Sequence, residues 1–241
     1  MFATRIYLIF SFDDSSKYVI RCAEILERHG FKGTFYLDTD KLLKELGHKL
    51  IVDLYSVGHE IGSHTVTHPD LTTLDRDRVL YELKVSKDVL ENILGAEIKS
   101  LAYPYGKYNR LILELAKLSG YRNARTVEPF NIKHPDDPFR LGVTFYTDPH
   151  ALRQILKAVR RLKWVKLLTN PLLLKQWDLL IEHYITHLLN SELENHVVVH
   201  ILTHPTFIAM RNDWQRFENL LSFLETLPAV NLTVSEYVEI I

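Results

Sequence analysis

Short apolar runs alternate with amphipathic stretches along most of the chain. The clearest apolar runs of strand length are residues 6–12, 34–37, 98–103 and 196–202. Between them lie segments whose apolar residues recur every three to four positions, which is the period of a helix. Nearly continuous apolar runs are typical of parallel strands covered on both faces. The alternation therefore predicts an α/β fold, with helices packed outside a parallel sheet.

The weaker elements extend the same alternation to the end of the chain. No internal repeat, low-complexity segment or linker divides the sequence, so we expect a single domain over residues 1–241. A loop is predicted for 128–138, which holds three prolines. The further strands expected are 57–61, 121–127, 140–146 and 229–232. Three helices are expected to begin after the cap residues Ser15, Thr72 and Thr233. The other helices are expected at 42–55 (interrupted near Gly47), 111–118, 151–162, 167–189 and 214–227.

Composition and charge exclude several classes of protein. Hydrophobic residues make up 46% of the chain and charged residues 24%, as in an ordinary globular protein. The formal net charge is −1, so no general basic field predicts nucleic-acid binding. No apolar run reaches the ~18 residues of a membrane span. The apolar run at 6–10 lacks a basic flank and a cleavage site, so we expect a cytoplasmic protein. The oligomeric state does not follow from the sequence.

Polar side chains come directly after several of the predicted strands. In a β/α barrel the carboxyl ends of the strands meet at one end of the barrel, where active sites are built. Side chains that follow different strands are therefore expected to share one site. The candidates are Asp13, Asp14, His64, His68, Tyr105 and His204.

A pair of histidines suggests metal chemistry at this end. His64 and His68 are four residues apart, and Pro69 disfavours a regular helix at His68, so a turn is expected. With Asp14 they offer three ligands and leave an open position, which is the pattern of catalytic zinc. A metal held in this way polarises a carbonyl and acidifies a bound water.

The remaining candidates supply the parts of a hydrolase. Asp13 is a candidate general base, and His204 is a candidate acid for the leaving group. The backbone N–H of Tyr105, in a tight turn, is a candidate oxyanion donor. Each residue also has a structural reading: Asp14 as a helix cap, Asp13 as the partner of an arginine. Their joint occurrence after strands favours hydrolysis of an amide or ester.

The same residues carry a resemblance to a known family. The chain resembles the polysaccharide deacetylases, the NodB-homology domain of carbohydrate esterase family four. The motifs are S-F-D-D at 11–14, H-T-V-T-H at 64–68, A-Y-P-Y at 102–105 and L-T-H at 202–204, and the resemblance covers about residues 5–240.

The resemblance implies a distorted barrel of about seven parallel strands and a hydrolase that acts on non-peptide carbon–nitrogen bonds. It implies removal of an acyl group, expected to be acetyl, from an N- or O-acetylated carbohydrate, either a small molecule or an oligosaccharide. A divalent metal, with zinc as the expected ion, would be bound by Asp14, His64 and His68. Asp13 would be the base and His204 the acid.

Two departures from the family pattern leave alternatives open. The arginine of the third motif is Ala102 here, and no D-x-x-D-W sequence is recognisable near 140–148. Since that arginine orients the catalytic base in the family, Arg125 or Arg140 is expected to replace it from a neighbouring strand. The alternatives are a hydrolase of a non-sugar amide or cyclic ureide, and a metal-binding barrel with impaired catalysis that acts as a binding protein.

Overall fold

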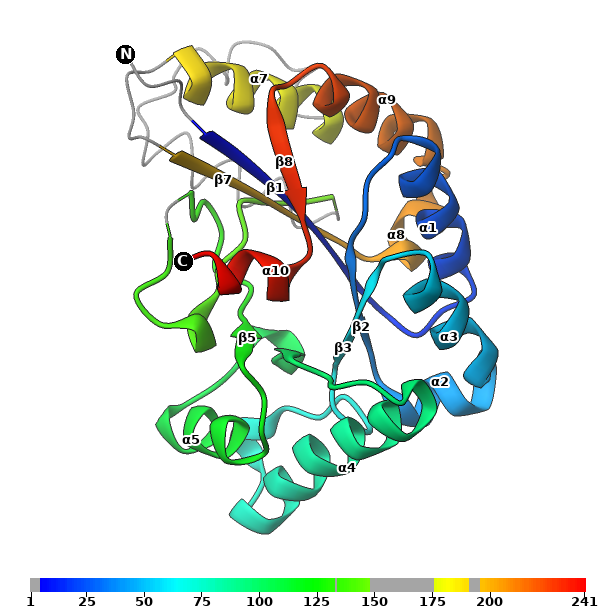
Figure 1. Ribbon diagram of the computed structural model, residues 1–241, viewed down its shortest axis with the longest axis vertical. Helices are drawn as coiled ribbons and strands as arrows, with labels where there is room; N and C mark the ends of the chain where they lie inside the picture. Colours follow the sequence, from blue (N-terminus) through cyan, green and yellow to red (C-terminus); the bar gives the residue numbers. More distant parts are fainter. Residues whose placement is uncertain (1–4, 133, 148–175, 191–195) are drawn as a thin grey trace.

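A single sheet organises the fold in the computed structural model, which describes residues 5–132, 134–147, 176–190 and 196–241 (Figure 1). The strand order is β5-β4-β3-β2-β1-β7-β6, β8 pairs with β1, and every pairing is parallel. This confirms the predicted α/β fold with about seven parallel strands. The strands are β1 (Arg5–Asp13), β2 (Thr34–Leu37), β3 (Glu60–Ser63), β4 (Ser100–Ala102), β5 (Asn123–Arg125), β6 (Phe145–Tyr146), β7 (His196–Thr203) and β8 (Ala229–Leu232).

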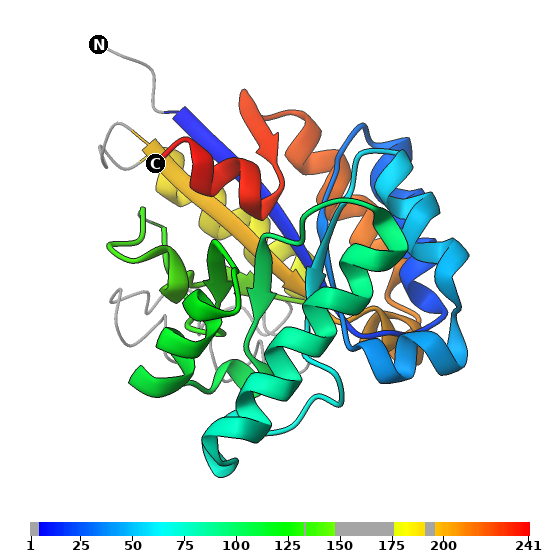
Figure 2. The same cartoon turned by 60° about the horizontal axis from the view of Figure 1, so that its bottom comes forward.

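Helices cover the outside of the strands (Figures 1 and 2). The longest helix among the described residues, α4, begins after the N-cap Asp75 and ends at Gly95, whose left-handed φ of 65° closes the last turn. The helices are α1 (Tyr18–Arg28), α2 (Thr39–Glu45), α3 (His48–Ser56), α4 (Arg76–Leu94), α5 (Arg110–Leu118), α7 (Trp177–Asn190), α8 (Pro205–Arg211), α9 (Trp214–Glu225) and α10 (Val234–Glu239), with 3₁₀ turns η1 (Leu71–Thr73), η2 (Pro104–Gly106) and η3 (Pro138–Arg140).

The long strand β1 lies at the centre of the sheet. One edge pairs with β7 from Arg5 to Phe12, and the two strands run side by side in both views (Figures 1 and 2). The other edge pairs first with β8 and then, from Ser11 to Asp13, with β2. Phe12 is therefore paired on both sides, with β7 and β2, and the last residue of β1, Asp13, is paired with Tyr36 in β2.

The segment between η3 and β6 joins the two sides of the sheet. Leu141 donates its N–H to the carbonyl of Ala124 at 3.0 Å and accepts from the N–H of Thr126 at 2.7 Å, so it extends the sheet beyond β5. A few residues later the N–H of Thr144 donates to the carbonyl of His200 in β7 at 2.7 Å. One short segment thus bonds to both β5 and β7, which closes a distorted barrel.

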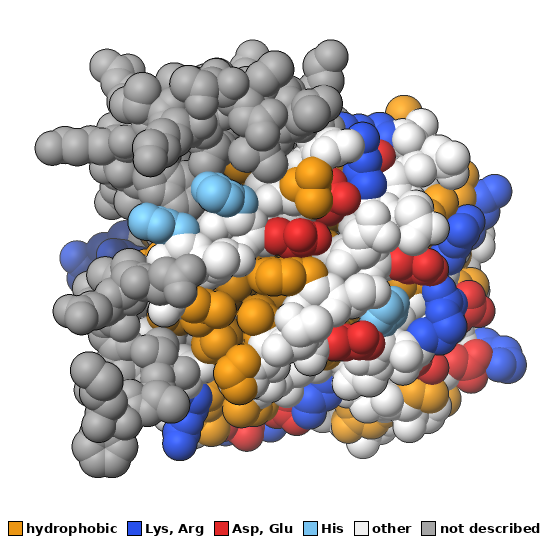
Figure 3. Space-filling model, turned by 90° about the horizontal axis from the view of Figure 1, so that it is seen from above, with side chains coloured by type: hydrophobic (Ala, Val, Ile, Leu, Met, Phe, Trp, Pro, Cys, Tyr) orange, Lys and Arg blue, Asp and Glu red, His pale blue; other side chains and the backbone are white. Residues whose placement is uncertain are grey.

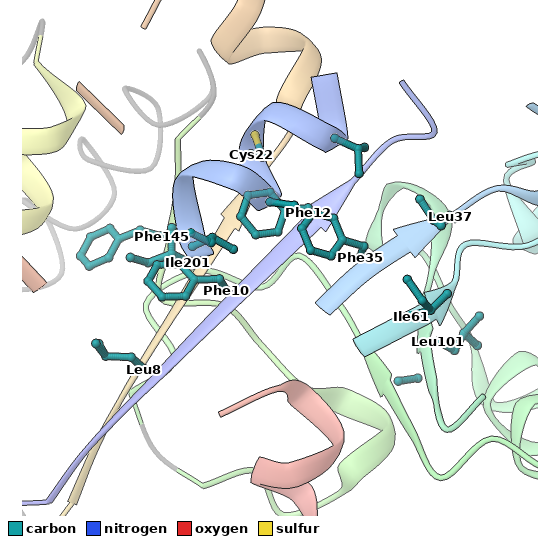
Figure 4. Close-up of a cluster of buried hydrophobic side chains, with 14 of the residues drawn as sticks. Leu8, Phe10, Phe12, Cys22, Phe35, Leu37, Ile61, Leu101, Phe145 and Ile201 are labelled. Atoms are coloured by element: carbon teal, nitrogen blue, oxygen red, sulfur yellow. The ribbon is translucent and has the colours of Figure 1, made fainter. Parts of the chain in front are cut away.

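The hydrophobic core lies between the strands and the outer helices (Figure 4). Phe12 stacks on Phe35 with ring centroids 4.7 Å apart, and Phe217 from α9 meets Phe12 edge-on at 6.1 Å. Such aromatic pairs add to the gain from burial alone. Cys22 is buried on α1, as expected for a small apolar residue. This packing fixes the end of β1 where the polar site begins.

Some element boundaries differ from those predicted. The strand expected at 57–61 begins only at Glu60, because α3 continues to Ser56 and Gly58 turns the chain with φ 94°. The strand expected at 140–146 is reduced to β6 because η3 occupies its start, and the sequence reading missed α8. The later part of the helix expected at 167–189 is present as α7, which begins at Trp177, and its first part, 167–175, lies outside the described residues. The helix expected at 151–162 lies outside the described residues.

The surface carries charges of both signs. On the face seen in Figure 3, basic and acidic side chains are interspersed around a stretch of hydrophobic ones. Within the described ranges, no helix combines the length and apolar character needed to cross a membrane.

Candidate active site

The carboxylate of Asp13 is the buried centre of the candidate site. It ends β1 and is only 4% exposed. Nη2 of Arg125, at the end of β5, donates to both carboxylate oxygens, at 2.7 Å and 2.6 Å. Arg125 is itself fully buried. A charge-assisted contact between two buried groups is strong, so the pair fixes the position of the carboxylate.

The register of the sheet explains why an arginine on β5 reaches this carboxylate. Ala102 on β4 is the parallel partner of Arg125 on β5. The third-motif position and Arg125 therefore lie side by side at the same height of the barrel. The other candidate, Arg140, lies elsewhere: its side chain is 60% exposed, and its Nε is 3.9 Å from Asp137. Of the two arginines, the structure places only Arg125 beside Asp13.

Arg125 is held by an aromatic ring and the backbone. Its Nη1 donates to the carbonyl of Thr126 at 3.1 Å, and its guanidinium carbon lies 5.1 Å from the centroid of the Tyr36 ring. The Tyr36 ring in turn lies against Gly62, where a Cβ atom would be 2.5 Å from the ring. Gly62 therefore leaves the space that the tyrosine needs to face the guanidinium.

His64 follows β3 and approaches Asp13 with one ring nitrogen. Its Nδ1 donates to the carbonyl of Ala102 at 2.8 Å, so in the neutral ring Nε2 carries a lone pair. That Nε2 lies 3.6 Å from Oδ2 of Asp13. Burial lowers the pKa of His64 to about 4, against the opposing effect of the Asp13 carboxylate. His64 is therefore neutral near pH 7.

His68 and Tyr105 continue the site toward the surface. The His68 ring meets the His64 ring edge-on with centroids 4.5 Å apart, and it meets the Tyr105 ring at 4.7 Å. Both residues have positive φ, 55° and 57°, as do Asp14 (107°) and Thr65 (70°). Four of the six non-glycine residues with positive φ in the described ranges thus surround this site. Clustering of strained backbone is common at functional sites.

Glu82 from α4 holds the turn that carries the two histidines. Its Oε2 accepts the N–H groups of Val66 and Thr67, both at 2.9 Å, and its Oε1 accepts the Thr67 hydroxyl at 2.8 Å. Glu82 is fully buried, so these bonds are shielded from water. The sequence reading missed Glu82. The feature of the sequence that could have indicated Glu82 is a carboxylate on the apolar, inward face of an amphipathic helix.

His204 follows β7 and completes the group around Asp13. Its Nε2 lies 3.9 Å from Oδ2 of Asp13, on the oxygen that also faces His64. Burial raises the pKa of Asp13, but Arg125 and then the two histidines more than offset it, so this pKa lies below its usual value. The carboxylate is therefore ionised near neutral pH and able to accept a hydrogen bond.

These side chains open into one cavity of about 600 Å³. It brings together residues that follow six different strands, β1 to β5 and β7, as expected for an active site at the end of a barrel. It also contains residues that the sequence reading did not single out, among them Lys41 of α2 and Phe207 of α8. The lining residues are Asp13, Asp14, Lys41, His64, His68, Tyr105, Val127, Tyr146, His204, Thr206 and Phe207.

The donor set at this cavity suits a divalent metal. Asp14, His64 and His68 line it, and they offer the oxygen and nitrogen ligands that zinc accepts. The unprotonated Nε2 of His64 faces a carboxylate oxygen at 3.6 Å, and a cation beside these two acceptors would stabilise both. Within the described ranges, however, no three His, Cys, Asp or Glu side chains already converge as a metal cluster. The residues fit a metal in chemistry without forming a preassembled cage.

Comparison with known proteins gives a family match over the first half of the chain. Residues 3–124 match the family described as "Polysaccharide deacetylase". The peptidoglycan-N-acetylmuramic acid deacetylase PdaA of Bacillus subtilis (strain 168) is 31% identical over 118 residues, which are 48% of this chain and 44% of that protein. The chain spans less than half the length of the curated relatives it matches first.

Solved structures extend the likeness over nearly the whole chain. The Xyl-CE4 domain of a multidomain xylanase, from the hindgut metagenome of Trinervitermes trinervoides, has a TM-score of 0.63 at 18% identity, covering 98% of this chain and 91% of that one. BA3943, a CE4 family pseudoenzyme from Bacillus anthracis, has a TM-score of 0.62 at 15% identity, covering 98% and 66%. At these identities the likeness establishes the fold, and the site residues must carry any argument about activity.

Proposed function

Because this chain belongs to the polysaccharide deacetylase family, we propose that it is a metal-dependent hydrolase that removes the acetyl group from an N-acetylated saccharide. The observation that carries the proposal is the buried Asp13 carboxylate, held by Arg125 and approached by His64 and His204 within one cavity. A fixed, ionised carboxylate between two imidazoles has the parts needed for proton transfer on both sides of a scissile amide.

In this proposal each residue of the chain has a separate task. Asp13 takes a proton from the water that attacks the acetyl carbonyl, and Arg125 keeps its carboxylate aimed at that water. His204 gives a proton to the nitrogen of the leaving amine. The backbone N–H of Tyr105, in η2, donates to the oxygen that becomes negative. The products are acetate and a free amino sugar.

The metal belongs to the proposal as a resident cofactor. Asp14, His64 and His68 would hold it, and zinc is the ion that their oxygen and nitrogen atoms suit. When bound, the metal would acidify a water and polarise the acetyl carbonyl. The Nδ1 bond of His64 to Ala102 orients the ring with Nε2 free to bind, which is the usual support for a ligating histidine.

The two neighbouring aspartates provide the test. Acetate release from acetylated oligosaccharides and metal content are measured for the wild type, Asp13→Asn and Asp14→Ala. Asp13→Asn keeps the shape but cannot take the proton, so it is expected to keep the metal and lose ~10²–10⁴-fold in rate. Asp14→Ala removes one of three ligands and is expected to lose both metal and activity.

Several outcomes would contradict the proposal. Absence of acetate release by wild-type protein supplied with divalent metals would remove the activity. Metal loss in Asp13→Asn with metal retained in Asp14→Ala would reverse the two roles. Unchanged metal content in both variants would mean that these residues form no metal site.

The alternative functions gain no specific support. No feature of the described cavity specifically favours hydrolysis of a non-sugar amide or a cyclic ureide. Impaired catalysis was suggested by Ala102, yet Arg125 supplies a guanidinium to Asp13 from the neighbouring strand. The cytoplasmic location and the single-domain extent over 1–241 stay predictions.

A further inference from the structure

Lys41 is a cation in the wall of the cavity that the proposed reaction does not use. It lies in the first turn of α2 and lines the same cavity as Asp14 and His68. Its backbone N–H donates to the N-cap Asp38 at 3.2 Å, and the N–H of Thr39 donates to the carbonyl of Thr65 at 3.1 Å. The start of α2 is therefore tied to the histidine turn, so Lys41 has a fixed place beside the site.

The charge of Lys41 lacks a close counter-ion. Other lysines nearby have one: Nζ of Lys107 lies 2.5 Å from Asp70, and Nζ of Lys44 lies 2.7 Å from Asp40. Across the part of the chain that the structure describes, Lys41 has no such ion pair within 4.0 Å. Its neighbour Asp38 interacts with the ammonium group only beyond 4.0 Å: burial raises the pKa of that carboxyl, the hydrogen bond from Ser15 and the charge of Lys41 oppose this rise, and one carboxylate oxygen accepts the backbone N–H of Lys41.

The other charged groups of the cavity do not compensate for Lys41. The carboxylate of Asp13 is already paired with Arg125 at 2.6 Å. Asp14 is assigned above to the metal. Lys41 as a whole is half-buried and lines the cavity, and a cation in the wall of a cleft attracts an anion brought in by a ligand. The rest of the wall supplies aromatic side chains, Tyr105, Tyr146 and Phe207, against which the apolar face of a sugar ring can pack.

We propose that Lys41 is a specificity-determining residue that selects N-acetylated saccharides carrying a carboxylate close to the acetamido group. A lactyl ether on the N-acetylated sugar, as in N-acetylmuramic acid, has this chemistry. The ammonium group of Lys41 pairs with that carboxylate while the acetamido group lies beside Asp13. This inference rests on the proposed deacetylation and adds the substrate class.

The test compares two substrates that differ only in charge. One is a peptide-free glycan of alternating N-acetylglucosamine and N-acetylmuramic acid; the other is the same glycan with its carboxylates converted to methylamides. Wild-type protein is expected to favour the charged glycan in kcat/KM by about tenfold or more, the usual size of one charge-assisted contact. Lys41→Gln is expected to remove the preference, and Lys41→Glu to reverse it.

Lys44→Gln is the matched control, because Lys44 lies on the same helix, is 70% exposed and is paired with Asp40. It is expected to keep the full preference. Equal turnover of both glycans by the wild type, or an unchanged preference in Lys41→Gln, would overturn the role of Lys41 and leave the deacetylation intact.

Absence of acetate release from every substrate would instead contradict the proposed function. In that case equilibrium binding of the two glycans decides the role of Lys41. Tighter binding of the charged glycan that Lys41→Gln abolishes would support the role. Equal binding would refute it.

Discussion

Asp13 and Arg125 are 112 positions apart in the sequence, yet they form the closest charged contact of the site. Burying such a pair is costly, and breaking it by removing one partner leaves an uncompensated charge. Arg125 is aligned with Ala102, so the guanidinium is displaced by one strand from where the family motif has it. At the scale of single residues, a positive charge stands beside the carboxylate of Asp13, and it comes from Arg125 on β5 rather than from position 102 on β4.

This displacement predicts a rescue. Arg125→Ala is expected to lower kcat/KM by at least about a hundredfold and stability by roughly 3–5 kcal/mol, the usual cost of an orphaned buried charge. Adding Ala102→Arg should return a guanidinium from the adjacent strand and recover about tenfold in rate. Acetate-release kinetics and urea unfolding measure both effects. Arg140→Ala, on the surface, is the control and should behave like wild type; full activity in Arg125→Ala would disprove the orienting role.

Among the elements, α4 and the histidine turn depend on each other. The turn between β3 and η1 includes Thr65 and His68 at positive φ, so its conformation needs support from outside. Glu82 supplies that support by accepting two backbone N–H groups and a hydroxyl. The position of the histidines is thus decided by a helix that begins several residues after them.

Removing this support should loosen the site. Glu82→Ala leaves buried N–H groups unpaired, at about 1–3 kcal/mol each, so the free energy of unfolding should fall by at least roughly 2 kcal/mol. Activity should fall more than about tenfold, because His64 and His68 lose their fixed geometry. Glu82→Gln, which keeps an accepting oxygen, should lose less. Asp88→Ala, exposed on the same helix, is the control. Equal stability of Glu82→Ala and wild type would show that Glu82 does not support the histidine turn.

The barrel as a whole encloses titratable groups in its interior, as His200 on β7 shows. Its Nε2 accepts from the Ser11 hydroxyl at 2.5 Å, and its Nδ1 donates to the carbonyl of Gly142 at 3.0 Å. The ring therefore connects β1, β7 and the segment that closes the barrel. Burial, and then the charge of Arg125, lower the pKa of His200 to about 3.

This shift makes the fold sensitive to acid. The pKa of a histidine in the unfolded chain is about 6.5, so the unfolded chain binds a proton at His200 below that pH. In the folded chain His200 binds this proton only when the pH approaches about 3. The free energy of unfolding should fall as pH drops from about 6.5, by up to ~1.4 kcal/mol per pH unit for each such histidine. His64 lowers the free energy of unfolding in the same direction. The stability that the ionised Asp13 contributes is lost in addition below about pH 4.

Urea unfolding with a chelator present, at pH values between 7 and 4.5, measures this slope. His200→Asn keeps a hydrogen-bond donor and an acceptor but does not titrate. The slope of the free energy of unfolding against pH should therefore decrease by the amount that corresponds to about one proton. The exposed His48→Asn is the control and should leave the slope unchanged. An unaltered slope in His200→Asn would show that His200 is not held neutral in the folded protein.

The sequence by itself determined the α/β class, the order of most elements and the polar residues that end the strands. These features follow from local chemistry. Apolar runs indicate buried strands, and the residues directly after a parallel strand lie at the end of the barrel where active sites are built. The strand order, the choice of Arg125 over Arg140, and the roles of Glu82 and His200 required the tertiary structure. Each depends on contacts between residues far apart in the chain, and no local pattern specifies which distant side chains meet until the parallel strands pair in register.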